Sequence, residues 1–311
     1  MSKKERILSP SRMKTLEDCT WRYWCNYHLM LPQKQNDGAM RGTICHLVFE
    51  LILGKERDGH LKLLIDKGLD GVPSVKRLVI SHLKKAGRFN DENYDLCNDM
   101  IVVGLNTDFW MNGSEDLEAE REFLIESEKP KYKCRGFIDK SAVYKNKNLV
   151  KIVDYKSSKY KFRGEELTAN FQAMAYTIAA KKIWPDIENV VAEFQFLRFP
   201  KQPVQQVEAS KDQLEGFEHY MAFVYEQINN FTEEKATSKF AAGSPKTRWL
   251  CKAGKTWRCP YLDPFEYYAI KNEDGNIVKT AFEKEELIES MTAKTKMVKM
   301  KYNGCPAHYQ E

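Results

Sequence analysis

Between residues 117 and 156 the sequence changes from helical spacing to short segments rich in Val, Ile, Phe and Tyr. Three such segments cover residues 120–126, 133–144 and 149–156. The polar run 145–148 separates the last two segments and is typical of a turn. These features predict a β-meander. A sheet of this kind needs apolar elements packed against it, so the fold must contain both a sheet and its cover.

Helical patterns precede and follow the meander. Ser9 and Pro10 suit the start of a helix that continues through Trp24, and apolar residues recur at helical spacing over about 39–53. Residues 55–113 have a polar helical pattern with breaks, which is typical of an inserted helical cap. The remaining expected elements are a helix at 165–183, a strand at 189–199 and a helix from a capping box at Ser210 and Gln213 to about 231.

This order of elements predicts the α/β (α+β) class, with a mixed central sheet flanked by helices. The sequence contains no internal repeat and no long Gly/Ser or Pro-rich linker, so we expect a single domain over 1–311. Its expected regions are N-terminal helices (1–54), a helical insertion (55–116), the core (117–232) and a Cys-containing C-terminal region (233–311).

Charge and hydropathy restrict the partners and the location. With 49 Lys and Arg against 44 Asp and Glu, the net charge is only +5, so any nucleic-acid contact depends on local clusters of charge. No apolar run approaches the roughly 20 residues that span a bilayer, and the basic N-terminus has no apolar segment behind it. We therefore expect a cytoplasmic protein with no membrane partner. Its eight cysteines are then expected to be reduced, as metal ligands or buried thiols.

The segment 149–156 ends in Asp154-Tyr155-Lys156. Side chains alternate along a strand, so Asp154 and Lys156 share a face, and Asp139 in the preceding strand could meet Asp154 across the hairpin. Two carboxylates that meet repel each other, so Mg²⁺ or Mn²⁺ held by Asp139, Asp154 and the carbonyl of Tyr155 is the natural partner. Such an ion would polarise a phosphate, and Lys156 would orient the attacking water. For an isolated D-x-K pattern the alternative is a surface ion pair.

The D-x-K pattern belongs to an ordered series of motifs. The residues Gly136-Phe137-Ile138-Asp139, Asp154-Tyr155-Lys156 and Gln172-Ala173-Met174-Ala175-Tyr176 resemble the consecutive motifs of the PD-(D/E)XK nuclease superfamily. Leu8-Ser9-Pro10-Ser11-Arg12 with Cys19, and Arg41-Gly42-Thr43 with His46, are similar to the opening motifs of its RecB-like branch. That branch includes nuclease domains of recombination helicase-nucleases, CRISPR-associated exonucleases and many phage exonucleases. The resemblance implies a restriction-endonuclease-like core.

The resemblance also implies roles for further residues. His46 matches a position that supplies an additional metal ligand, and Glu50 lies one helical turn further along the same face. Gln172 and Tyr176 match a pair that orders the active site and approaches the DNA phosphate. Some relatives carry another acid in the first strand, and Glu120 and Glu122 are both candidates for that position.

Four cysteines match part of the [4Fe–4S] site found in many members of that branch. They are Cys19, Cys251, Cys259 and Cys305. The resemblance implies a structural cluster that ties the N-terminal helix to the C-terminal region. The tight C-x₂-C spacing of the branch is missing, and Cys305 follows an insertion that includes 271–301, so zinc or free buried thiols are alternatives. The other cysteines are expected to fill apolar space: Cys25, Cys45, Cys97 and Cys134.

A basic run follows the D-x-K motif directly. Lys159, Lys161 and Arg163 would neutralise phosphates and make DNA binding sensitive to salt. Tyr160 and Phe162, which alternate with them, would stack on unpaired bases. A solvated surface is the alternative for such a run.

These features predict a Mg²⁺- or Mn²⁺-dependent exonuclease that hydrolyses phosphodiester bonds at DNA ends. Its setting would be recombination, repair or phage DNA processing, in the cytoplasm of a bacterium or a phage-infected host. Its expected partners are single- or double-stranded DNA ends, with further copies of the chain or recombination and replication proteins as candidates. The alternatives are a catalytically idle DNA-binding subunit and an endonuclease of the same superfamily. Asp139, Asp154 and Lys156 together favour an enzyme.

Overall fold

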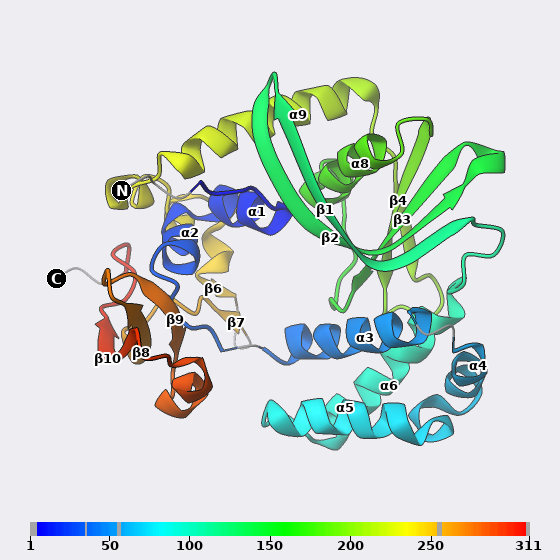
Figure 1. Ribbon diagram of the computed structural model, residues 1–311, viewed down its shortest axis with the longest axis horizontal. Helices are drawn as coiled ribbons and strands as arrows, with labels where there is room; N and C mark the ends of the chain where they lie inside the picture. Colours follow the sequence, from blue (N-terminus) through cyan, green and yellow to red (C-terminus); the bar gives the residue numbers. More distant parts are fainter. Residues whose placement is uncertain (1–4, 35, 55–56, 254–256, 309–311) are drawn as a thin grey trace. The chain divides into compact units, whose positions relative to one another are not determined.

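The computed structural model describes residues 5–34, 36–54, 57–253 and 257–308 (Figure 1). Its contacts divide the chain into two compact units, which we call the sheet unit and the cysteine unit. The sheet unit comprises Ile7–Pro10 and Gln35–Tyr225, and the cysteine unit comprises Met1–Arg6, Ser11–Lys34 and Glu226–Glu311. The single domain over 1–311 and its four regions stay a prediction.

A five-stranded sheet in the order β1-β2-β3-β4-β5 forms the centre of the sheet unit. Its strands are β1 (Asp116–Glu128), β2 (Lys131–Tyr144), β3 (Leu149–Lys156), β4 (Asn189–Phe196) and β5 (Val204–Val207). β3 and β4 are parallel, and the other neighbours are antiparallel. The predicted meander and mixed sheet are therefore confirmed. The structure adds β5, which is too short to show a pattern in the sequence.

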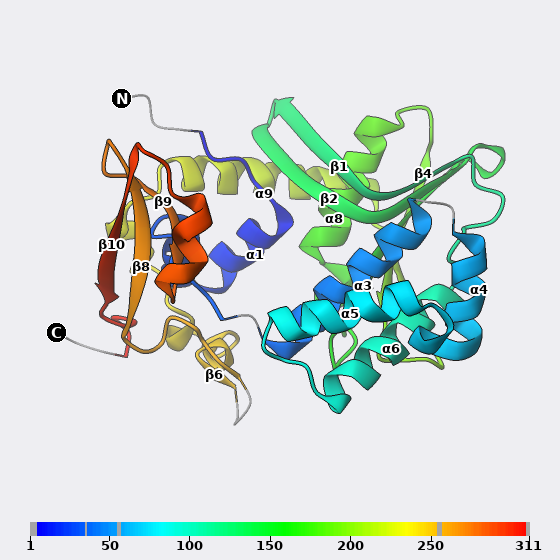
Figure 2. The ribbon, with the colours of Figure 1, turned by 60° about the horizontal axis from the view of Figure 1, so that its bottom comes forward.

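Four helices cover one face of this sheet (Figures 1 and 2). They are α3 (Asp37–Leu53), α4 (Asp58–Lys67), α5 (Pro73–Lys85) and α6 (Asp91–Asn106). Val75 and Leu83 of α5 are at most 1% exposed and join a core that also holds Tyr155 of the sheet. The helices within residues 58–106, expected from their polar helical pattern, thus bury one apolar face in this core and expose the other. That they are an insertion stays a prediction. Lys55, where the insertion was expected to begin, lies outside the described residues.

The other face of the sheet is covered by α8 (Phe171–Ile183), which contacts β1, β3 and β4. Ala173 of α8 packs against Phe194 of β4. The short helix α7 (Glu165–Thr168) precedes α8, and α9 (Lys211–Asn229) follows β5. α9 begins at the predicted capping box, in which Ser210 and Gln213 exchange side-chain to backbone hydrogen bonds.

The cysteine unit combines short helices with two small sheets. Its helices are α1 (Pro10–Asp18), α2 (Thr20–Tyr27) and α10 (Glu233–Ala236), and its strands are β6 (Lys252–Ala253), β7 (Trp257–Arg258), β8 (Phe265–Asn272), β9 (Ile277–Ala281) and β10 (Thr295–Tyr302). One helix was expected through Trp24, but the extended backbone of Cys19, with φ −167° and ψ 117°, separates α1 from α2. Residues 271–301, expected to belong to an insertion, form most of β9 and β10 in the sheet β10-β8-β9. The insertion itself stays a prediction.

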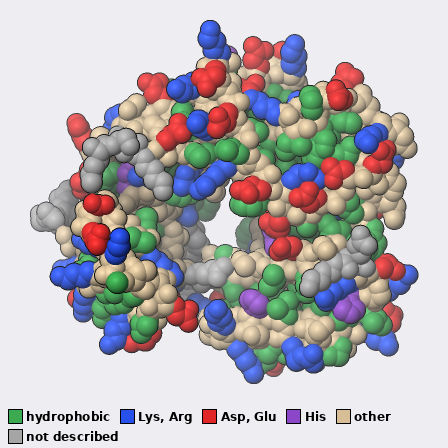
Figure 3. Space-filling view, in the orientation of Figure 1, with side chains coloured by type: hydrophobic (Ala, Val, Ile, Leu, Met, Phe, Trp, Pro, Cys, Tyr) green, Lys and Arg blue, Asp and Glu red, His purple; other side chains and the backbone are tan. Residues whose placement is uncertain are grey.

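Short 3-10 helices complete the described fold at Gly68–Gly71, Lys145–Lys147, Ala241–Gly243, Arg248–Leu250 and Lys284–Ser290. Among the described residues, no helix has both the length and the apolar character that crossing a membrane requires. Lys and Arg side chains alternate with Asp and Glu side chains over the surface in Figure 3, as the small net charge predicts.

Candidate functional site

The site begins where β2 separates from β3. β2 pairs with β3 only over Lys140–Tyr144, and the β1–β2 ladder is interrupted where Glu120 stands opposite Asp139. Glu120 has a φ of +49°, in the left-handed region that a glutamate seldom adopts. Backbone strain of this kind costs about 1–3 kcal/mol and is concentrated at functional sites.

The interruption changes the face on which the side chains of β1 lie. Ala119 packs against the α3–α6 core, whereas Phe123 contacts the ring of Tyr176 on α8, although residues 119 and 123 of a regular strand share a face. Glu120, next to Ala119, also points to the α3 side and reaches His46. The irregular backbone therefore aims an acid at α3 that a regular strand would aim away from it.

His46, Glu120 and Asp139 form a group of three potential metal ligands. His46 Nδ1 lies 3.5 Å from Asp139 Oδ1 and 3.8 Å from Glu120 Oε1. One donor atom of each residue lies within 4.8 Å of the others, a separation that a single cation can bridge. The three side chains remain partly exposed, so water and a phosphate group can reach them.

Ionisable groups shift one another in this cluster. Burial and the charge of Asp154 raise the pKa of Asp139 to about 7. Burial disfavours the charged form of His46, but the carboxylates of Glu120, Asp139 and Asp154 outweigh burial and raise the pKa of His46 to about 9. The group therefore retains protons near neutral pH, and a divalent cation would take their place.

The backbone of Tyr155 connects the two halves of the group. Its N–H donates to Asp139 Oδ2 at 2.8 Å, and its carbonyl oxygen lies 3.2 Å from His46 Nε2. Its buried ring packs against Phe49 of α3, with ring centroids 4.4 Å apart. Protein contacts alone thus hold His46 and Asp139 in position.

A second set of side chains surrounds Asp154, which is 3% exposed. Lys156 Nζ lies 2.5 Å from Asp154 Oδ2 and donates to Gln172 Oε1 at 2.7 Å. The amide nitrogen of Gln172 donates to Asp154 Oδ1 and, at 2.7 Å, to the hydroxyl of Tyr176. These bonds orient the Lys156 amine and balance a carboxylate that would be costly to bury alone.

The glycine of the G-F-I-D motif has a packing role in this second set. A Cβ atom at Gly136 would lie 2.7 Å from the ring of Phe123. The same ring contacts Tyr176, with centroids 5.9 Å apart and an edge-to-face geometry. Gly136 therefore gives Phe123 the space to support Tyr176, and through it Gln172.

The structure thus places the predicted site residues in two adjoining sets. Asp154 lies outside the group of three, although its charge raises the pKa values of both His46 and Asp139. Of the two acids that the sequence could not separate, Glu120 joins the group and Glu122 is exposed. Glu120 could not be selected from the sequence because its orientation depends on its unusual φ.

In the run of basic and aromatic residues after β3, some side chains are exposed and others contact the protein. Lys159, Tyr160 and Arg163 are exposed, with Tyr160 80% exposed. Lys161 donates to the carbonyl of Gln202. Phe162 is partly buried, and its ring packs edge-to-face against Phe194 and Phe196, with centroids 4.9 and 5.2 Å away. That it stacks on bases stays a prediction, which these contacts do not favour.

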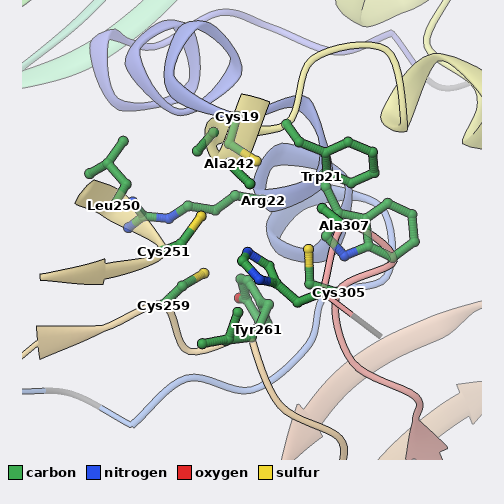
Figure 4. Close-up of a pocket in the computed structure, with 14 residues that line it drawn as sticks. Cys19, Trp21, Arg22, Ala242, Leu250, Cys251, Cys259, Tyr261, Cys305 and Ala307 are labelled. Atoms are coloured by element: carbon green, nitrogen blue, oxygen red, sulfur yellow. The ribbon is translucent and has the colours of Figure 1, made fainter. Parts of the chain in front are cut away.

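Four cysteines line one pocket in the cysteine unit (Figure 4). They are Cys19, Cys251, Cys259 and Cys305. Their sulfur atoms point into a common space, next to the side chain of Arg22. The backbone fixes two of the segments, since Cys259 N–H donates to the Cys251 carbonyl at 3.0 Å and Cys305 N–H to the Leu262 carbonyl at 3.1 Å.

The cysteine sulfurs are spaced more widely than the donors of the His46 group. Among the described residues, no three cysteine sulfurs lie within 4.8 Å of one another. Burial raises the pKa of the Cys305 thiol to about 12, and the other three thiols add to this shift. Cys25, which does not line the pocket, is fully buried, with its sulfur 3.7 Å from the hydroxyl of Tyr302.

Comparisons with known proteins agree with these motifs. Residues 7–262 match the family model of the PD-(D/E)XK nuclease superfamily. No curated protein matches the sequence significantly. Among solved structures, a supposed exonuclease from Eubacterium rectale matches at 10% identity, over 78% of this chain and 87% of that chain, with a TM-score of 0.44. A protein from Vibrio cholerae matches at 13% identity, over 75% of this chain and 59% of that chain, with a TM-score of 0.23. Because the family model covers most of the sequence, this chain belongs to the PD-(D/E)XK nuclease superfamily.

Proposed function

We propose that this nuclease-superfamily protein is a Mg²⁺- or Mn²⁺-dependent DNA exonuclease. The observation that carries the proposal is the group of His46, Glu120 and Asp139 beside a lysine held by Asp154 and Gln172. The two sets supply what phosphodiester hydrolysis requires: ligands for a divalent cation and an amine next to them. The resemblance of the opening motifs to the RecB-like branch supports action on DNA ends, in recombination, repair or phage DNA processing.

The donor set fits the ion that the family implies. His46, Glu120 and Asp139 would hold it, with Asp154 and the carbonyl oxygen of Tyr155 adjacent. Carboxylate and carbonyl oxygens are suitable ligands for Mg²⁺ and Mn²⁺. The imidazole of His46 favours Mn²⁺ over Mg²⁺, because Mg²⁺ binds almost only oxygen. When bound, the ion would polarise the scissile phosphate and lower the pKa of a water molecule.

The chain's own residues perform the remaining tasks. Lys156 orients the attacking water and offsets the negative charge that develops on the phosphate. The side-chain carbonyl oxygen of Gln172 accepts a hydrogen bond from the Lys156 amine, and its amide nitrogen donates to Asp154. The same amide nitrogen donates to the Tyr176 hydroxyl, which fixes its orientation. Tyr155 keeps His46 and Asp139 at their separation through its backbone.

The exposed side chains that follow Lys156 support DNA as the substrate. Lys159 and Arg163 would neutralise phosphates, and Tyr160 would stack on an unpaired base. Lys161 contributes less than the sequence indicated, because its amine already donates to Gln202. Tyr160→Ala should weaken binding of a single strand, and unchanged binding would remove Tyr160 from the interface.

Two other functions are compatible with this family. An idle DNA-binding subunit would keep the fold without cleavage, and an endonuclease would use the same chemistry within a continuous strand. The complete set of Asp139, Asp154 and Lys156 favours the enzyme over the idle subunit. We place the enzyme in the cytoplasm of a bacterium or a phage-infected host. Further copies of the chain, or recombination and replication proteins, are its candidate partners.

One experiment separates the three functions. Purified protein is incubated with end-labelled linear DNA and with closed circular DNA, in Mg²⁺, Mn²⁺ or EDTA. Metal-dependent loss of linear DNA alone indicates an exonuclease, and loss of circles indicates an endonuclease. Asp154→Ala and Lys156→Ala should abolish either activity while Glu166→Gln, an exposed acid outside the site, should not. Absence of cleavage under all conditions would leave the idle subunit.

We further propose that the four pocket cysteines hold a structural [4Fe–4S] cluster. An all-sulfur donor set fits either iron–sulfur or zinc. Tetrahedral zinc would bring the sulfurs to about 3.8 Å from one another, whereas this pocket holds no three within 4.8 Å. The wider spacing supports the larger group.

The cluster has a direct test. Protein purified without oxygen should be brown, absorb at about 400 nm and contain iron and sulfide. Cys259→Ser should remove the colour, while Cys45→Ala, at a buried cysteine of the sheet unit, should retain it. A colourless protein that contains zinc would contradict the proposal.

A further inference from the structure

We call His46, Glu120 and Asp139 the metal group. Between this group and its turn, the β1–β2 hairpin has one buried and one exposed face. Phe123, Ile125, Tyr132 and Cys134 are at most 4% exposed on the buried face. On the opposite face, Phe137 is 53% exposed and Leu124 is 57% exposed. Two large apolar side chains therefore face solvent on a hairpin whose core is already complete without them.

The register places these two side chains together. Phe137 stands opposite Glu122, and Leu124 stands opposite Arg135. Phe137 and Leu124 are thus diagonal neighbours, at a separation of about 7–8 Å that an aromatic side chain can bridge. They form one apolar patch, with Arg135 at its edge.

The same register connects the patch to the metal group. Phe137 lies two residues before Asp139 on the same strand, so the two side chains share a face of this part of the hairpin. Two residues of a strand span about 7 Å, roughly the length of one nucleotide in an extended chain. A nucleotide next to a phosphate at the metal group would therefore lie over Phe137.

The chemistry of the patch favours an unpaired base over a duplex. A flat aromatic ring stacks on any base whose face is free, but the bases of a duplex are already stacked on one another. The acids Glu122 and Glu126 on the same face do not suit a phosphate backbone, and Glu126 pairs with Lys133 at 3.5 Å. Arg135, opposite Leu124, is exposed and can contact a phosphate. The patch thus presents a surface for one base, with the Arg135 side chain beside it.

We propose that Phe137, supported by Leu124, stacks on the unpaired base next to the scissile phosphate, and that the substrate is a single-stranded DNA end. The inference rests on the proposed nuclease function and adds its substrate class. Phe137 acts by holding the strand, and the metal group and Lys156 act on the phosphate.

The test compares two exposed phenylalanines of the sheet unit. Phe137→Ala is paired with Phe223→Ala on α9, where Phe223 is 57% exposed. Binding of a fluorescent oligothymidine and of a blunt duplex hairpin is measured by anisotropy with Ca²⁺ in place of Mg²⁺. Phe137→Ala should weaken single-strand binding about tenfold and leave duplex binding unchanged. Phe137→Trp should retain single-strand binding, and Phe223→Ala should behave as the wild type.

Each result supports or overturns the inference. Equal single-strand binding by Phe137→Ala and Phe223→Ala overturns it, as does an equal loss of duplex binding. A fall in melting temperature for Phe137→Ala would show a role in folding, and retained binding by Phe137→Trp separates stacking from that role. If the wild type cleaves DNA and Phe137→Ala binds single strands as tightly as the wild type, the stacking role is refuted and the nuclease function stands. If single-strand binding depends on Phe137 but the wild type cleaves no DNA, the nuclease function is refuted and the stacking role stands.

Discussion

The metal group of the sheet unit and the cysteine pocket differ in what holds their donor atoms. The backbone of Tyr155 fixes Asp139 and His46, and the positive φ of Glu120, between two paired residues of β1, sets the direction of its side chain. In the pocket a few hydrogen bonds fix the backbone, and the four thiols come from separate segments that line a common space. We therefore expect the first site to keep its arrangement without an ion, and the pocket to become rigid only when a ligand joins its thiols.

The two sites also differ in how far apart their residues lie in the sequence and in what elements carry them. The metal group is built on strands and a long helix, each with its own hydrogen bonds and core. The pocket joins the α1–α2 junction to segments near residues 251 and 305, which are more than 200 residues away in the sequence. A ligand that joins distant segments stabilises a fold by far more than one that binds a formed site.

The largest expected effect is on folding of the cysteine unit. Cys259→Ser should lower the melting temperature by about 10 °C or more, because a structural metal site contributes several kcal/mol to folding. Circular dichroism and limited proteolysis measure this, and cleavage sites should appear within residues 226–311. Cys97→Ala, at a buried cysteine of the sheet unit, is the control. An unchanged melting temperature in Cys259→Ser would show that the pocket, too, is organised by the protein alone.

The second prediction concerns Asp139. Asp139→Asn should lower the rate of DNA cleavage by about 10³-fold or more, because it removes a metal ligand. The same change should leave the metal-free protein as stable as the wild type or more stable, since burial and the Asp154 charge already oppose the charged form of Asp139. Cleavage assays and thermal unfolding in EDTA measure the two effects. A large loss of stability would contradict the idea of a site that forms without its ion.

The third prediction is the pH dependence of metal binding. With pKa values near 7 for Asp139 and 9 for His46, both groups must lose protons before they can bind a cation. Affinity for Mn²⁺, measured by calorimetry, should therefore rise from pH 6 to pH 9. The free energy of unfolding without metal should change in the opposite direction, because raised pKa values stabilise the fold at low pH and this contribution is lost as pH rises through about 7 and 9. Affinity that is independent of pH would indicate that these residues are not ligands.

Sequence reasoning selected residues that the structure brings together at both sites, but it predicted only part of their geometry. Asp154 and Lys156 were identifiable because an acid and an amine end an apolar strand. His46 was a candidate because the resemblance to the RecB-like branch implies a metal ligand at its position. These signals are local, and local patterns are set by the periods of strands and helices.

The parts that sequence reasoning missed depend on contacts between distant segments. Glu120 joins the metal group through an interrupted ladder and a positive φ, neither of which has a residue signature in a glutamate. Phe162 was expected to stack on unpaired bases, but its ring packs against two phenylalanines of β4 and is partly buried. The exposure of Phe137, by contrast, could have been predicted from the sequence. Phe137 lies two residues before Asp139 in the same strand, so the two side chains share a face, and an apolar residue on that otherwise polar face is unusual.

The smallest expected effect comes from Lys140, behind the metal group. Lys140 is 1% exposed, donates to the Phe109 carbonyl at 3.1 Å and lies over the rings of Phe109 and Tyr155. Burial lowers its pKa to about 7, so the folded protein releases a proton that the unfolded chain keeps. The cost of this residue to stability therefore grows as pH falls from about 10 toward 7.

Lys140→Met should therefore stabilise the sheet unit by about 1–3 kcal/mol at pH 6 and by less at pH 9, measured by urea unfolding. Lys147→Met, at an exposed lysine after the same strand, should change stability by no more than about 0.5 kcal/mol. Mn²⁺ affinity should stay within about twofold of the wild type, because the bonds from Tyr155 to Asp139 and His46 remain. A large loss of affinity would mean that the buried cation, and not the strand backbone, holds the metal group in place.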